Sequence, residues 1–271
     1  MHREDTLSRI KELHKLYLEG KIRGPEIHEV HPYLPIDSRE NYLYFMLPCC
    51  LNFQRNSPAM WRSALTTFED PDTNYLFLPE KIVGMSKGEV QKDLTKHKLA
   101  LQQNKHTDIW IRTSETLSKH YNNDPRKVLE EGNFDVNQII QNLQKNKKHL
   151  FPYLGGIKLS NYWLFILSRF TDVKLENINE ISIIPDTHII KSTIKLGLAE
   201  PGVKSAEVEQ IWRVILKEVK IPPVEMHPTL WAWSRQNFWP DVELSEDSGS
   251  DMGLSEDFSP RQLELKLIDF S

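Results

Sequence analysis

Residues 150–167 read LFPYLGGIKLSNYWLFIL, and this stretch decides the fold. We expect one helix to end at about His149, Gly155 and Gly156 to form a tight turn, and a new helix to start at about Ile157. A glycine turn that leads into a helix points free backbone N–H groups outward, and such groups bind a phosphate without reading sequence. Lys158 lies in the first turn of the new helix, where the helix dipole favours an acid. A functional need for its charge or its amine would explain that placement.

A second segment, residues 183–190, reads IIPDTHII. Asp186 precedes an apolar-periodic helix and is expected to be its N-cap, because its carboxylate can accept hydrogen bonds from the free N–H groups of the first turn. Taken singly, each residue has an ordinary explanation, Asp186 as a structural cap and Lys158 as a solvated surface lysine. The two segments therefore have to be interpreted together.

The hydrophobic pattern predicts an all-α fold. Apolar residues recur at helical spacing, and Pro, Gly, Asn or Asp bound most of the segments. Residues 181–184 are mostly β-branched but too few to imply a sheet. About ten helices are expected, at residues 5–19, 39–54, 57–68, 79–84, 86–104, 107–121, 135–148, 158–170, 187–196 and 205–218.

The composition is that of a globular intracellular protein. The chain has 271 residues, enough for one large domain or two small ones, and its 7 Trp, 8 Tyr and 11 Phe exclude bulk disorder. Cys49 and Cys50 are adjacent, and they are too few for a disulfide framework, a four-cysteine iron–sulfur site or a zinc site. The sequence suggests neither a signal peptide nor a membrane span.

Charge is distributed unevenly along the chain. The net charge is −4, but the nine acids and two bases from Asp241 onward give the tail −7, so that residues 1–240 carry +3. Residues 81–158 hold 14 bases and 8 acids. A basic body in front of an acidic tail fits a protein whose body meets a polyanion, and an ordinary solvated surface is the alternative.

Together the two segments resemble the helix–hairpin–helix DNA glycosylase superfamily, which contains endonuclease III and the 8-oxoguanine glycosylases. In that family a glycine-rich hairpin ends in Gly-x-Lys, and a Val-Asp-Thr-His-like motif follows a few tens of residues later. Residues 156–158 (GIK) match the first motif and residues 186–188 (DTH) the second. Residues 51–57 (LNFQRNS) look like the loop whose Gln fills the gap left by a flipped base. The resemblance spans roughly residues 40–235.

The chain also departs from the family pattern. The 28-residue step from Lys158 to Asp186 is longer than in endonuclease III and looks more like the archaeal 8-oxoguanine branch. The hairpin reads LGGI instead of Pro-Gly-Val-Gly, which leaves its detailed turn open. The C-terminal cysteine cluster of endonuclease III is absent, so the resemblance implies no iron–sulfur cofactor. It does allow a monovalent cation at the hairpin carbonyls.

The resemblance implies a bifunctional DNA glycosylase with AP lyase activity. Lys158 would attack the sugar C1′ and expel a damaged base, and the resulting Schiff base would permit β-elimination. Asp186 would stabilise positive charge on the sugar, and His188 would orient the Asp turn or be structural. A protonated lysine cannot attack, so we expect Lys158 to lie at the mouth of a cleft, partly desolvated.

Further residues would bind the DNA. Gln54 would be the wedge, and the alternative is a polar helix terminus. Residues 226–233 (MHPTLWAW) look like the apolar segment that closes the base pocket in 8-oxoguanine enzymes. Aromatic faces suit a flipped purine, although each tryptophan could instead belong to the core. The pocket candidates are Trp61, His227, Trp231 and Trp233, and the candidates for contact with the DNA backbone are Gly155, Gly156 and Lys148, the last of which could also be solvated.

The expected architecture is two helical subdomains with the active cleft between them. Residues 1–39 would pack with 179–240, residues 40–178 would form the central subdomain with the hairpin, and residues 241–271 would be a disordered acidic tail. His28 and His31 have a metal-ligand spacing, but no further ligand set is visible, so we expect no metal site.

We expect 8-oxoguanine in double-stranded DNA as the substrate. The alternatives are the same chemistry on another modified base, and a non-catalytic helix–hairpin–helix protein that binds DNA. The protein would be a monomer, associated with DNA in the nucleoid, cytoplasm or nucleus, and would require no cofactor.

Overall fold

The computed structural model describes residues 3–22 and 29–241, and within these the protein is all-α, as the sequence predicts. The only β-type pairing in the described residues is an isolated bridge between Asp135 and Glu176. Twelve α-helices are formed in this part of the chain: α1 (Arg3–Leu18), α2 (Arg39–Met46), α3 (Ser57–Glu69), α4 (Pro79–Ile82), α5 (Lys87–Lys96), α6 (Gln103–Tyr121), α7 (Arg126–Glu131), α8 (Val136–Gln141), α9 (Ile157–Phe170), α10 (Thr187–Lys195), α11 (Ser205–Val219) and α12 (Pro223–Arg235).

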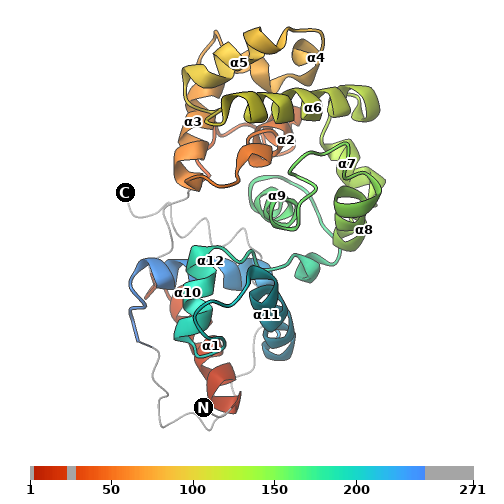
Figure 1. The fold of residues 1–271 in the computed structure, drawn as a ribbon. Helices are drawn as coiled ribbons and strands as arrows, with labels where there is room; N and C mark the ends of the chain where they lie inside the picture. Colours follow the sequence, from red (N-terminus) through yellow and green to blue (C-terminus); the bar gives the residue numbers. More distant parts are fainter. Residues whose placement is uncertain (1–2, 23–28, 242–271) are drawn as a thin grey trace.

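The buried side chains form two hydrophobic clusters. One cluster draws its buried residues from Tyr42 to Ile181 and lies among helices α2 to α9. The other combines Ile10, Leu13 and Ile22 with residues between Ile183 and Trp233, so that α1 packs with α10, α11 and α12. Figure 1 shows these two groups of helices one above the other. The chain passes from one cluster to the other just before Asp186.

Helix α9 is the element at which the two clusters meet. Its buried side chains, including Trp163 and Leu164, belong to the first cluster. On another face the ring of Phe165 contacts the ring of His227 on α12 edge to face, with centroids 5.8 Å apart. Val224, at the start of α12, also packs against the first cluster. Residues on α9 therefore have neighbours in both groups of helices.

Several helix boundaries differ from the predicted ones. The predicted helix 86–104 ends at Lys96, because Lys98 adopts a left-handed conformation with φ +59° and separates α5 from α6. The predicted helix 39–54 ends at Met46 and passes into a 3₁₀ turn (Pro48–Leu51), since Pro48 lacks the N–H needed to continue it. The predicted helix 135–148 ends at Gln141 and continues as a π-helical turn (Asn142–Asn146).

Helices α7 and α12 were not expected. Helix α7 has only six residues, which is too short for a clear apolar period. Helix α12 contains Pro228 in its interior, a residue that argues against a helix in the sequence. Tertiary packing overrides that preference, because Met226, Leu230 and Trp233 are fully buried in the second cluster. None of the helices in the described residues is long and apolar enough to cross a membrane.

His106 connects the start of α6 to the loop before it. The residue is 1% exposed, and its Nδ1 accepts a hydrogen bond from the Leu101 N–H at 3.1 Å. Burial lowers the pKa of His106 to about 4, and the nearby charges of Arg55 and Lys105 act in the same direction. The ring is therefore neutral in the folded protein at pH 7.

This burial predicts a loss of stability in acid. An unfolded histidine takes up a proton near pH 6.5, whereas folded His106 takes it up near pH 4, so the unfolded state binds more protons in between. The free energy of unfolding should fall by roughly 1–3 kcal/mol as the pH drops from 6.5 to 4. Denaturant unfolding of wild type and His106→Gln at both pH values measures it. An equal fall in the variant would assign the acid sensitivity to other groups.

Candidate functional site

The turn that precedes α9 is built around the close approach of two backbone segments. A Cβ on Gly155 would lie 2.6 Å from the Leu143 carbonyl oxygen and 3.1 Å from that of Phe151. No side chain fits there, because both neighbours are backbone atoms. Tyr153 adopts a left-handed conformation with φ +65°, which reverses the chain before the glycines. Gly155, which the sequence places at the turn, is thus required because no larger residue fits there.

The expected free N–H groups of the two glycines are not found. The Gly155 N–H donates to the Phe151 carbonyl at 2.9 Å, and the Gly156 N–H donates to the Tyr153 carbonyl at 2.9 Å. These hydrogen bonds close the turn, so the prediction that Gly155 and Gly156 offer free donors to a phosphate is wrong. Gly156 is the N-cap of α9 and has no side chain to bond the first turn. An anion near the hairpin would therefore meet the start of α9 itself.

Lys158 lies in that first turn and is exposed. Its neighbour Ile157 is also 68% exposed, so little protein covers this end of the helix. The expected partial desolvation of Lys158 is wrong for the protein alone. Beneath the turn, the Sγ of Cys49 is 3.9 Å from the Leu159 carbonyl oxygen. Burial raises the pKa of that thiol well above its usual range, which keeps Cys49 protonated and unreactive.

Asp186 forms the N-cap of α10, as the sequence predicts. Its Oδ1 accepts hydrogen bonds from the N–H groups of His188 at 2.8 Å and Ile189 at 3.0 Å. The segment before it is tied to α9, because the Ser182 N–H donates to Oδ1 of the buried Asn161 at 2.8 Å. Asn161 lies one turn after Lys158 on the same helix. This hydrogen bond thus joins the first segment to the residue directly before the second segment.

The pKa of His227 responds to the charges of both Lys158 and Asp186. Burial lowers its pKa; the Asp186 carboxylate opposes that shift, whereas Lys158 and Arg169 lower the pKa further. Each of the three charges is therefore close enough to act on the one imidazole ring. Nδ1 of His227 is buried and has no hydrogen-bond partner among the described residues. A buried nitrogen without a partner is costly unless a ligand supplies one, which fits the predicted place of His227 in a base pocket.

Phe165 and Arg169 were not expected at the site. They follow Lys158 by 7 and 11 residues, a spacing that puts all three on one face of α9. The guanidinium carbon of Arg169 lies 5.5 Å from the centre of the Phe165 ring. The helical period, counted from Lys158, would have predicted that both residues lie on the same face of the helix.

His188 and Trp231 lie next to each other, on α10 and α12. Their ring centroids are 5.0 Å apart, and Nδ1 of His188 is 3.1 Å from Oγ of Ser234. Arg235 covers the Trp231 ring at 4.9 Å. Burial lowers the pKa of His188, which is partly offset by Asp186. His188 therefore links the Asp186 turn to the half-buried Trp231, in keeping with an orienting role.

Two of the predicted pocket tryptophans are core residues. Trp61 and Trp233 are both 0% exposed and belong to the first and second cluster respectively. Their indole N–H groups are also satisfied, by the Tyr162 hydroxyl at 2.8 Å and by the Pro240 carbonyl at 2.9 Å. The expectation that they stack on a base is wrong, because no face of either ring is accessible.

Gln54 and Lys148 are exposed near the turn. Gln54 has a left-handed backbone with φ +50° in the loop between the 3₁₀ turn and α3. A left-handed residue in an exposed loop is compatible with the predicted wedge. The Cγ of Lys148 would be 3.3 Å from a Cβ on Gly155, so the lysine stem lies along the hairpin. Its contact with a DNA backbone stays a prediction.

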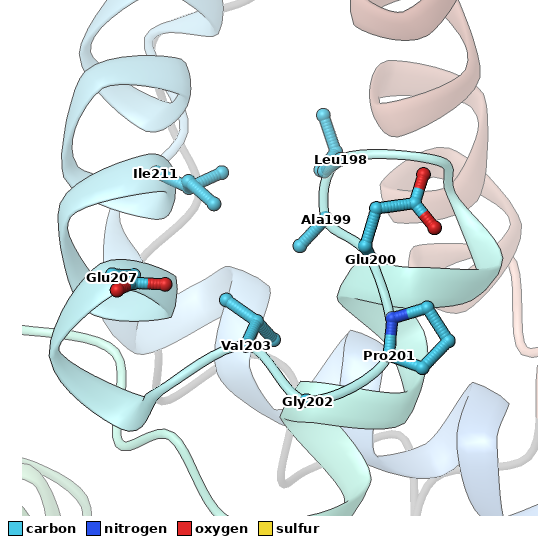
Figure 2. A pocket seen from close by; sticks show the side chains of 8 residues that line it. All are labelled: Leu198, Ala199, Glu200, Pro201, Gly202, Val203, Glu207 and Ile211. Carbon is cyan, nitrogen blue, oxygen red and sulfur yellow. The ribbon is translucent and has the colours of Figure 1, made fainter.

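Two cavities lie away from these residues. One of about 420 Å³ is formed by residues 198–203 with Glu207 and Ile211, between α10 and α11 (Figure 2). Another, of about 220 Å³, includes Ile157 and Arg213 in its lining. Neither includes Lys158 or Asp186.

No metal site is visible in the part of the chain that the structure describes, where no three His, Cys, Asp or Glu side chains gather. His31 is enclosed by the rings of Tyr33, Phe45 and Phe170, whereas His28 lies outside the described residues. The acidic tail from residue 242 onward also lies outside them. A monovalent cation at the hairpin stays a prediction.

No protein-family model matches the chain, and no curated protein matches it either.

Gly155→Ala tests the turn. The added methyl group meets the Leu143 and Phe151 carbonyls, so we expect the free energy of unfolding to fall by about 1–3 kcal/mol. Gly88→Ala is the matched control, because Gly88 lies in α5 with nothing within 4 Å of a Cβ, and alanine favours a helix by up to about 1 kcal/mol. Chemical denaturation measures both. Equal effects of the two substitutions would contradict the close packing.

Proposed function

We propose that this protein is a bifunctional DNA glycosylase with AP lyase activity, with 8-oxoguanine as the expected base. The observation that carries the proposal is the hydrogen bond from the Ser182 N–H to Oδ1 of Asn161, which ties the chain just before Asp186 to the helix of Lys158. The charges of Lys158 and Asp186, 28 positions apart in the chain, both shift the pKa of His227, in opposite directions. An amine and a carboxylate that act on one position are the pair that this chemistry requires.

In the proposed reaction, the neutral amine of Lys158 attacks the sugar C1′ of a flipped nucleotide. The bond from C1′ to the base breaks, and the base leaves with the bonding electron pair and takes up the proton that Nζ loses. The Asp186 carboxylate stabilises the positive charge that develops on the sugar. Ring opening gives a Schiff base between Nζ and C1′. Loss of a C2′ proton then expels the 3′ phosphate by β-elimination, and water releases the lysine.

Asp186 can combine capping with this electrostatic role. Both of its hydrogen bonds to the start of α10 use Oδ1, and they hold the carboxylate in a fixed orientation. The second oxygen, Oδ2, takes no part in the cap. Asp186 can therefore cap α10 and take part in the proposed reaction at the same time.

Exposure of Lys158 has a consequence for the reaction. The protein alone does not exclude water from the amine, so in this proposal the bound DNA covers it. The same exposure is the observation that favours the alternative, a non-catalytic helix–hairpin–helix protein in which Lys158 contacts a phosphate.

Borohydride trapping separates these functions. We expect wild type to form a covalent adduct with a duplex carrying one 8-oxoguanine opposite cytosine, and Lys158→Gln to form none. Lys217→Gln, a change at an exposed lysine of α11, is the matched control and should retain the adduct. An adduct on an abasic duplex but not on the 8-oxoguanine duplex would refute 8-oxoguanine as the substrate and support the same chemistry on another base. No adduct on either duplex would contradict the enzyme and leave the DNA-binding alternative.

Substitutions of Asp186 separate its charge from its cap. An Asn side chain can accept the same two hydrogen bonds, so Asp186→Asn should keep the unfolding free energy near that of wild type. Removal of the charge should slow single-turnover base excision by about 10²–10³. Asp186→Ala should in addition lose about 1 kcal/mol of stability. If Asp186→Asn excises the base at the wild-type rate, the carboxylate does not stabilise the sugar.

A further inference from the structure

Two loops on the surface of the first cluster are joined by a pair of aromatic rings. Phe53 in the loop 52–56 stacks on Tyr153 in the turn 152–156, with centroids 4.1 Å apart and ring planes at 14°. The Nζ of Lys105, in the first turn of α6, lies 4.8 Å from the Phe53 centroid and 4.7 Å from the Tyr153 centroid. Tyr153 is 40% exposed, so the ring pair lies at the surface.

The loop 52–56 is also fastened to the segment between α5 and α6. Arg55 donates from Nη1 to the Leu99 carbonyl at 2.7 Å and from Nη2 to the Lys98 carbonyl at 3.3 Å. The ring of His106 meets the Phe53 ring edge to face at 5.2 Å. Three segments far apart in the sequence thus converge on Phe53.

Four lysines stand around this junction without a carboxylate partner. Lys105 lies at the edge of the ring pair, the backbone carbonyl of Lys98 accepts a hydrogen bond from Arg55, the stem of Lys148 lies along Gly155, and Lys158 follows the turn. Within the described residues none of the four forms an ion pair, whereas Lys96 and Lys147, each close in sequence to one of them, bind Asp70 and Glu131. The junction therefore carries uncompensated positive charge beside exposed aromatic surface.

This combination fits a nucleic-acid backbone. Phosphates are bound by unpaired lysines, and aromatic rings beside them offer faces to sugars or unstacked bases. A lysine that is already held against the edge of two rings loses less side-chain freedom on binding than a free one.

We propose that Lys105 binds a phosphate of double-stranded DNA, and that the Phe53–Tyr153 stack positions it by joining the loop of Gln54 to the hairpin turn. The choice of DNA as the partner rests on the proposed function. Gln54 is next to Phe53 in the chain, so the same stack fixes where the predicted wedge stands relative to the hairpin. The surface defined by Phe53, Lys105 and Tyr153 holds no residue of the proposed chemistry.

The salt dependence of DNA binding tests Lys105. Each phosphate neutralised contributes about 0.9 to the slope of log K against log salt concentration. We expect Lys105→Gln to reduce the magnitude of that slope on an undamaged duplex by about 0.9. The loss of affinity that the substitution causes is then roughly eightfold larger at 0.1 M than at 1 M salt. Lys217→Gln removes the same charge from α11 and should leave the slope unchanged. Equal slopes for the two variants would overturn the proposal.

Variants of Tyr153 test the stack. Tyr153→Phe keeps both rings and should retain the wild-type slope and affinity. Tyr153→Ala removes one ring without any change of charge. We expect it to reduce the slope by about half or more of the reduction that Lys105→Gln causes. Adding Lys105→Gln to Tyr153→Ala should then weaken binding less than it does in wild type. Full additivity of the two changes would contradict the positioning role, and thermal unfolding of each variant verifies that it is folded.

These outcomes are distinct from those of the trapping experiment. Wild type that binds DNA with a slope dependent on Lys105 but gives no borohydride adduct would retain this surface and refute the enzyme. An adduct together with a slope independent of Lys105 would retain the enzyme and refute this surface. Wild type that does not bind duplex DNA at all would overturn both proposals.

Discussion

The start of α9 depends on the contact between the Gly155 backbone and the Leu143 carbonyl. Because a Cβ at this position would be 2.6 Å from that oxygen, only glycine lets the turn close against the preceding segment. The N–H groups of both glycines are then used within the turn, and α9 begins without a side-chain cap. Lys158 is carried into solvent as a consequence. The placement of the candidate nucleophile is thus a result of backbone packing several residues before it.

From that start, α9 places one face between the two hydrophobic clusters. Lys158, Phe165 and Arg169 follow one another along this face, and His227 of α12 packs against it. Asp186 lies four residues after Ser182, whose N–H donates to Asn161 of α9. A site made in this way needs both groups of helices, since each supplies residues that the other lacks. The exposed amine of Lys158 and the buried Nδ1 of His227, which has no partner among the described residues, are groups that a bound ligand would complete.

Local signals in the sequence predicted the all-α class, the glycine turn and the Asp186 cap, because each depends on nearby residues. Tertiary contacts decided the rest. Trp61 and Trp233 look like pocket aromatics in the sequence, but both rings are fully buried, and the Trp61 N–H donates to Tyr162, which is 101 positions away in the chain. The break of the predicted helix 86–104 at Lys98 depends on Arg55, from a loop more than forty residues earlier, which binds the carbonyls there. The stack of Phe53 on Tyr153 joins residues 100 positions apart and leaves no trace in either segment.

In the proposed site, Lys158 and Asp186 act on one position beside His227. Titration of the His227 ring by NMR, in wild type, Lys158→Gln and Asp186→Asn, measures this most directly, with His227→Gln to assign the signal. Removal of the cation should raise the pKa of His227, and removal of the carboxylate should lower it, because the two charges shift it in opposite directions. A pKa of His227 that stays the same in both variants would contradict the shared site.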